Sequence, residues 1–222
     1  GHAFGLKDVE SFAVPSGVFV SYEKEDGSHE TAVLRVHRKG INLTRVNAVN
    51  QVSRQAERGE ITLDGALRAL QAIEYSTLYT NKQILPAAGI SAAAWAIMFG
   101  GGIADFFIAF ATAVVVELLT QWMTKRQVHG YMATLLCSFV STILPQLVCH
   151  ALQTGSPEAC IAGALMPLLP GLAMTNAIQD TMRGDIVSGV AHGMNAILIA
   201  GMIAGGTLCA SSLFHLLIGG LM

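Results

Sequence analysis

Apolar residues gather in long, almost uncharged runs beyond residue 82. A helix needs about 20 apolar residues to cross the hydrocarbon core of a bilayer, which is about 30 Å thick. The last run reaches residue 222 without a charge, so that helix either continues along the membrane interface or breaks near Gly205 and Gly206. The pattern predicts five membrane-spanning helices and an apolar C-terminal tail, with the spans at about 84–101, 102–123, 128–152, 159–178 and 186–208.

The first 82 residues are more polar and show mixed periods. Strand-forming residues on both sides of Asp26-Gly27 are typical of a β-hairpin, and later apolar residues recur at helical spacing. These patterns predict a cytosolic α+β segment over 1–82, with the end of a helix over 4–14, a β-hairpin at about 18–36, and helices at about 42–58 and 63–81. The transmembrane domain then covers 83–222.

Charge is distributed as unevenly as hydropathy. Only 13% of the residues are charged, about half of the roughly 25% found in soluble domains. The net charge of −2 gives no indication of a nucleic-acid surface. Ten of the 13 Lys and Arg residues lie within 1–82, and the others are Lys125, Arg126 and Arg183. If the spans alternate in direction, all the basic segments share one side, which the positive-inside rule places in the cytoplasm. We therefore predict a mainly α, polytopic membrane protein with a cytoplasmic N-terminus.

The fourth span is interrupted by Pro167, Pro170 and Gly171. Each proline removes a backbone donor and clashes with the preceding turn, so an intact helix is not expected here. In transporters, such breaks free amides and carbonyls to bind substrate or ions. The alternative is a proline kink that serves packing alone.

Polar residues recur at one-face helical spacing on both sides of the turn between spans four and five. They are candidates for substrate binding or gating, although Asp180 and Arg183 would also suit an ordinary interfacial pair, and His192 a hydrogen-bonded packing role. The set comprises Asn176, Asp180, Arg183, Asp185, Ser188, His192 and Asn195.

Span two contains two acids, Asp105 near its outer end and Glu117 about 9 Å from its inner end. Acids inside a membrane are costly and usually face a cavity or a partner, so both are candidates for ion or proton coupling. Asp105 could also lie in the outer interface.

The four cysteines are predicted to be buried free thiols. Cys149 and Cys160 flank one short polar loop, where a disulfide requires an oxidising compartment. The sequence contains no P-loop, zinc-ligand spacing or hydrolase motif. We therefore predict no catalytic residue, metal or cofactor, and expect transport to be driven by an ion or substrate gradient.

Residues 166–192, MPLLPGLAMTNAIQDTMRGDIVSGVAH, resemble the signature of the threonine/serine exporter family. The matching features are a proline-glycine break, an Asn-Ala-Ile-x-Asp run, a Gly-Asp pair and a Ser-Gly step. In this sequence they are Pro170-Gly171, Asn176-Ala177-Ile178 with Asp180, Gly184-Asp185 and Ser188-Gly189. The N-terminal part is similar as well, at Val9-Glu10 and at Asn42-Leu43.

The resemblance implies a subunit of an exporter in the bacterial cytoplasmic membrane. The chain looks like the split form of the family, which implies a second small hydrophobic membrane subunit and a hetero-oligomer with several copies. The substrate would be a small carboxylate-bearing metabolite, either threonine/serine or a succinate-like dicarboxylate. The alternatives are a non-transporting membrane subunit that recruits a partner through its cytosolic domain, and an intramembrane hydrolase using Ser188 and His192, which lack an oxyanion context.

Overall fold

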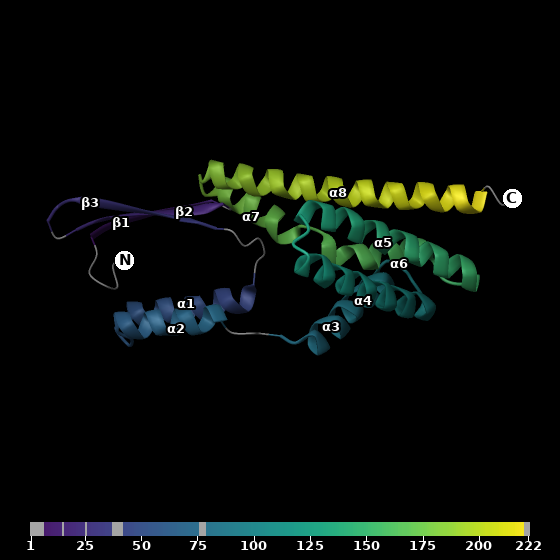
Figure 1. Ribbon diagram of the computed structural model, residues 1–222, viewed down its shortest axis with the longest axis horizontal. Coiled ribbons are helices and arrows are strands. Elements are labelled where there is room, and N and C mark those ends of the chain that lie inside the picture. The colour runs from purple at the N-terminus through teal and green to yellow at the C-terminus, as the bar shows by residue number, and fades with distance from the viewer. Residues whose placement is uncertain (1–6, 15, 25, 37–41, 76–78, 220–222) are drawn as a thin grey trace. The chain divides into compact units, whose positions relative to one another are not determined.

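The computed structural model describes residues 7–14, 16–24, 26–36, 42–75 and 79–219. It is mainly helical, and the chain forms two compact units. The first comprises Gly1–Leu78 together with Gly184–Ala191, and the second comprises Tyr79–Arg183 together with His192–Met222. Figure 1 shows their elements.

The first unit contains a three-stranded antiparallel sheet in the order β1-β2-β3. Its strands are Lys7–Val14, Gly17–Glu23 and His29–Arg35. The β2–β3 turn contains Gly27 at φ +80°, and Asp26 Oδ1 accepts the Ser28 N–H at 2.9 Å. The helical end expected over 4–14 is wrong for the described residues. Residues 10–14 pair continuously with β2, and this ladder of interstrand hydrogen bonds overrides a weak local helical pattern.

Two helices complete the first unit, α1 (Leu43–Glu57) and α2 (Leu63–Tyr75). The Asn42 side chain caps α1 by accepting the Arg45 N–H at 3.0 Å, as a helix N-terminus requires. The predicted end of the second helix at residue 81 is wrong, because the Thr80 backbone already caps the next helix and its N–H is accepted by Gln83 Oε1 at 3.1 Å.

The second unit is a bundle whose helices follow the predicted spans in order. Among the described residues, three helices are long and apolar enough to cross a membrane, and the bent α6–α7 pair makes a fourth candidate. The first predicted span corresponds to α3, whose polar start at Asn81-Lys82-Gln83 shortens its apolar stretch. The elements are α3 (Asn81–Met98), α4 (Ile103–Lys125), α5 (Gly130–Leu152), α6 (Pro157–Leu165), the 3₁₀ turn η2 (Met166–Leu168), α7 (Gly171–Met182) and α8 (Ile186–Gly219).

Small residues bring α3 and α6 into close contact. Ala92, Ala93 and Ala96 on α3 are fully buried. A Cβ on Gly163 of α6 would meet the Ala92 carbonyl oxygen and lie 2.8 Å from the Ala96 nitrogen. Close backbone approach through small residues is typical of helix pairs in membranes.

Helices α5 and α8 are joined side by side by a ladder of hydrogen bonds (Figure 1). The partners are 64 or 65 residues apart at every rung, so the two helices run parallel and in register. The chain between them must therefore return along the full length of α5, which makes the α6–α7 pair one broken crossing. The rungs join Tyr131 to Asn195, Ser138 to Met202, Thr142 to Thr207, and Gln146 to Ser211.

The last helix is continuous through Gly205 and Gly206, so the break considered there does not occur. Gly206 instead lies against α5, where a Cβ would meet Ser138 Oγ and the Leu135 carbonyl oxygen.

Candidate functional site

The predicted break within the fourth span is confirmed. Helix α6 ends at Leu165, the 3₁₀ turn follows, and α7 begins at Gly171 with a 54° change of direction. Pro167 lies in the turn, and Pro170 directly precedes α7. Within the described residues no side chain caps the first turn of α7. Its N-terminal amides and the positive end of its dipole are therefore suited to an anionic group.

The break lies toward one end of the bundle. Leu168 packs against Val116, Met123 and Cys137. Met123 is two residues from the end of α4, and Cys137 is about two turns from the start of α5. Helix α7 then runs outward from this level, antiparallel to α8 from His192 onward.

Contacts between α7 and α8 set the position of the polar residues. A Cβ on Gly193 would lie 3.8 Å from the Ala177 Cβ. One turn further out, His192 Nε2 lies 3.8 Å from Asp180 Oδ2, with each side chain about 25% exposed. The pair is ionic only when the imidazole is protonated, so its strength depends on the charge of His192.

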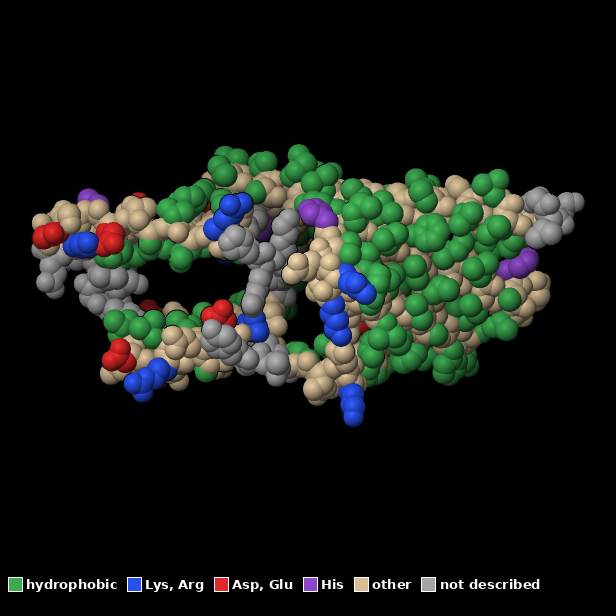
Figure 2. Space-filling view, viewed as in Figure 1, with side chains coloured by type: hydrophobic (Ala, Val, Ile, Leu, Met, Phe, Trp, Pro, Cys, Tyr) green, Lys and Arg blue, Asp and Glu red, His purple; other side chains and the backbone are tan. Residues whose placement is uncertain are grey.

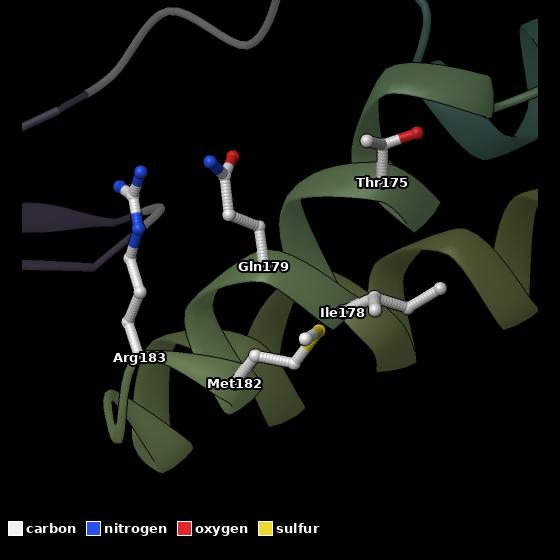
Figure 3. Close-up of a pocket in the computed structure, with 5 residues that line it drawn as sticks. All are labelled: Thr175, Ile178, Gln179, Met182 and Arg183. Atoms are coloured by element: carbon white, nitrogen blue, oxygen red, sulfur yellow. The ribbon is translucent and has the colours of Figure 1, made fainter.

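A shallow pocket lies on α7, lined by Thr175, Ile178, Gln179, Met182 and Arg183. Figure 3 shows Thr175, Gln179 and Arg183 pointing to the same side of the helix, as their four-residue spacing requires. This row offers a hydroxyl, an amide and a guanidinium. Such groups can together bind a carboxylate and a neighbouring polar group.

The cations of the second unit lie at the same end as this pocket. Between residues 79 and 222 the sequence contains four Lys or Arg residues: Lys82, Lys125, Arg126 and Arg183. They lie at the start of α3, the end of α4 and the end of α7. We call this end of the bundle the cationic end. Figure 2 shows blue side chains gathered there.

The structure brings together only part of the predicted set. Asp180 and His192 meet, Arg183 lines the pocket, and Asn195 accepts a 2.9 Å hydrogen bond from the Tyr131 hydroxyl. Asn176 is half-buried on α7. Asp185 and Ser188 belong to the Gly184–Ala191 segment of the first unit, so their role at this site stays a prediction.

The two acids of span two lie far apart along α4. Glu117 is half-buried and accepts a 3.1 Å hydrogen bond from Gln121 on its own helix. Asp105 is only 3% exposed and lies at the opposite end of the bundle from the pocket. Its carboxylate accepts the N–H groups of Gly102 and Ser156, both at 2.7 Å. These bonds favour a structural role for Asp105 over ion coupling.

Sequence reasoning missed Thr175, Gln179 and Tyr131. The first two lie eight and four residues before Arg183 on one helical face, a spacing that could have identified them. Tyr131 had no comparable signal, because its partner Asn195 is 64 residues away.

The fold and the charge distribution define a multi-pass helical membrane protein with one broken helix. The chain belongs to the family described as "Putative threonine/serine exporter", whose model matches residues 1–214. The family resemblance seen in the sequence is thus confirmed.

Similar proteins are named as transporters. The chain is 25% identical over 200 residues to the "Probable succinate transporter subunit YjjP" of Escherichia coli (strain K12) and, equally, to that of Klebsiella aerogenes. Each match covers 90% of this chain and 77% of the relative. The chain is also 27% identical over 171 residues to the "Threonine/serine exporter" of Corynebacterium glutamicum, covering 74% of this chain and 35% of that protein. No solved structure matches the chain. The relatives are transporters and not enzymes, which supports a transporter role here.

Proposed function

We propose that this chain is a subunit of a secondary exporter in the bacterial cytoplasmic membrane. Its substrate is a small carboxylate-bearing metabolite, either threonine/serine or a succinate-like dicarboxylate. The names of the relatives support both substrate classes. The observation that carries the proposal is the pocket on α7, beyond the break, where Arg183 lies on the same side as Thr175 and Gln179.

In this proposal the cationic end faces the cytoplasm, in line with the positive-inside rule. The N-terminal segment is then cytoplasmic, and the α7 pocket is the entry site for substrate. Arg183 provides the counter-charge for a carboxylate, while Thr175 and Gln179 bind its polar neighbours. Asn176, Asp185 and Ser188 are further candidates for substrate binding or gating.

The pair of Asp180 and His192 acts as a gate. It joins α7 to α8, with His192 Nε2 and Asp180 Oδ2 3.8 Å apart. Asp180 is also the group that would bind the ammonium of an amino acid. Glu117, half-buried in α4, is the second candidate for proton coupling.

The proposed complex contains a second small hydrophobic membrane subunit and several copies of each chain. The relatives' name describes them as a transporter subunit. Helix α8 supports the same idea, since it exposes a continuous set of large apolar side chains to lipid or to a partner: Val187, Val190, Met194, Ile197, Leu208 and Leu216.

The test is efflux of radiolabelled threonine, serine and succinate from vesicles containing this chain with and without its partner subunit. We expect efflux of one substrate class with both subunits, and a loss of at least tenfold for Arg183→Gln. Arg126→Gln is the matched control, because this cation of the same end lies 5.7 Å from the Trp122 ring and outside the pocket. Equal rates for the two variants would exclude Arg183 as the substrate's counter-charge. No flux with both subunits present would favour the alternative, a non-transporting subunit that recruits a partner.

A further inference from the structure

Three buried groups meet at the end of the bundle opposite the pocket: Asp105, Cys149 and Cys160. Their ligand-type atoms all lie within 4.8 Å of one another. Cys149 is 5% exposed and Cys160 is fully buried, yet both are close to a polar, exposed loop at residues 153–155. Cys149 precedes the end of α5, and Cys160 follows the start of α6.

The Asp105 carboxylate holds this loop against the start of α4. Its Oδ1 accepts the Ser156 N–H at 2.7 Å and faces the Cys160 thiol at 3.2 Å. Gly155 completes the turn at φ +85°, where a Cβ would lie 2.5 Å from Asp105 Oδ1 and 3.4 Å from Cys149 Sγ. The loop is therefore shaped so that the two sulfur atoms and the carboxylate face one another without an intervening side chain.

The donor set favours thiol chemistry over a metal ion. A structural metal centre with thiolate ligands needs four ligands, and the described residues bring only three together here. Both Asp105 oxygens already accept backbone N–H groups. Two thiols on neighbouring helix ends, with their sulfur atoms within 4.8 Å of one another, instead have the proximity that a disulfide needs.

We propose that Cys149 and Cys160 form a reversible disulfide that locks the α5–α6 loop, with a disulfide of the oxidising compartment as the oxidant. The Cys149 thiol, the more exposed of the two, attacks the oxidant to give a mixed disulfide and releases one thiol. Cys160 passes its proton to Asp105 and attacks the Cys149 sulfur. The second thiol leaves and takes that proton from Asp105. Two cysteine thiols are oxidised, one disulfide is reduced to two thiols, and Asp105 is again a carboxylate.

The bridge acts on the broken crossing. Helix α6 is only nine residues long and leads directly into the 3₁₀ turn before α7. A covalent link from α5 to the start of α6 fixes one end of this crossing and leaves the α7 end free to move. The inference concerns a different site from the proposed substrate pocket, and the orientation proposed above enters only in naming the compartment that holds the oxidant.

The experiment uses the full chain with Cys137→Ser and Cys209→Ser, so that Cys149 and Cys160 are the only cysteines. The reduced protein is incubated folded with oxidised glutathione, quenched in acid and analysed by intact mass and thiol titration. We expect both thiols to disappear, with the loss of two hydrogens and no glutathione retained. Addition of dithiothreitol should restore both thiols.

Two matched variants make the result specific. With Cys160→Ser in the same background, we expect one glutathione to remain on Cys149. A chain that keeps only Cys137 and Cys209 should not form an internal bridge. Retention of both thiols by the Cys149/Cys160 protein, or attachment of two glutathiones, would overturn the proposal. None of these outcomes depends on transport.

The role of Asp105 is tested separately by the rate of closure. We expect the Asp105→Asn variant to resolve the mixed disulfide at least roughly tenfold more slowly, because a positioned base is lost. A rate equal to that of the parent protein would remove Asp105 from the proton path.

Discussion

The Tyr131 hydroxyl donates a 2.9 Å hydrogen bond to Asn195 Oδ1 and thereby joins the second residue of α5 to the tenth residue of α8. This bond is the first rung of the parallel ladder between the two helices. His192 lies less than one helical turn before Asn195 on α8, so the register of α8 at this rung also sets the position of His192 against α7.

Removing this rung should weaken the bundle near the pocket. For Tyr131→Phe we expect a loss of about 1 kcal/mol in stability, because the hydrogen bond from the Tyr131 hydroxyl to Asn195 Oδ1 is lost. Unfolding in detergent and solute efflux measure the two effects. Thr134→Val is the control, because Thr134 Oγ1 bonds only within its own helix, to the Gly130 carbonyl. Equal stability and equal efflux of the two variants would mean that the Tyr131–Asn195 bond does not set the register between α5 and α8.

The two neighbouring glycines of α8 should respond in opposite ways to alanine. Gly206→Ala places a methyl group against Ser138 Oγ and the Leu135 carbonyl oxygen, and we expect a loss of about 1–3 kcal/mol from overpacking. Gly205 has nothing within 4 Å of a Cβ, so Gly205→Ala should gain up to about 1 kcal/mol from helix propensity. Thermal unfolding of the purified variants compares them directly. A stability change of the same sign for both variants would contradict the close approach of α5 and α8.

Restoring a continuous helix across the break should separate stability from transport. Replacing Pro170 and Gly171 together by alanine restores a backbone donor and raises helix propensity, so stability should hold or rise. The amides at the start of α7 would then pair within the helix, and we expect efflux to fall strongly. A double variant that assembles and exports at the parent rate would show that the break is a packing kink. Asp180→Asn should also reduce efflux, but through charge, and should alter its pH dependence.

The proposed orientation can be tested by cysteine labelling in a cysteine-free background. A membrane-impermeant maleimide added from outside should modify Ser156→Cys, in the exposed loop region before α6, and leave Lys125→Cys, at the cationic end, unmodified. Labelling of both after permeabilisation is the control for reactivity. The reverse pattern would place the pocket outside the cell and overturn the entry-site proposal.

The β-hairpin of the first unit should be sensitive to acid. Glu30 accepts bonds from Lys24 at 2.7 Å and from the Tyr22 hydroxyl at 2.9 Å, and the Lys24 bond, followed by the Tyr22 bond, lowers the pKa of Glu30. A lowered folded-state pKa means that this stabilisation is present above the unfolded pKa and is lost as the pH falls through the folded value. The protection factors of the β2–β3 amides, which correct for the intrinsic pH dependence of hydrogen exchange, should therefore fall as the pH drops through the lowered pKa of Glu30.

Glu30→Gln should remove most of that acid dependence, whereas Glu10→Gln on β1 should retain it. Because the Lys24–Glu30 pair is exposed to solvent, we expect its effect on the stability of the hairpin to be small. An identical acid profile for Glu30→Gln and the parent chain would show that the ion pair does not stabilise the hairpin.

The sequence alone determined the parts of this protein that depend on local patterns. Apolar runs located the helices of the bundle, and the two prolines with Gly171 located the break, because hydropathy and a missing backbone donor act within a few residues. The positions of Lys and Arg along the sequence also predicted that the basic segments share one side of the membrane. The segment before Pro15 was misread as helical, since a strand is stabilised by pairing that no local period reports.

Tertiary structure decided what each polar residue does. Asp105 was expected to be a coupling acid, yet its partners Ser156 and Cys160 lie 51 and 55 residues away. Asn195 pairs with Tyr131 across 64 residues, and His192 meets Asp180 only because α7 folds back along α8. Spacing on one helix shows which side chains share a face, but the neighbour of that face is set by how distant helices pack, and this depends on small residues such as Gly163 and Gly206 whose fit appears only in three dimensions.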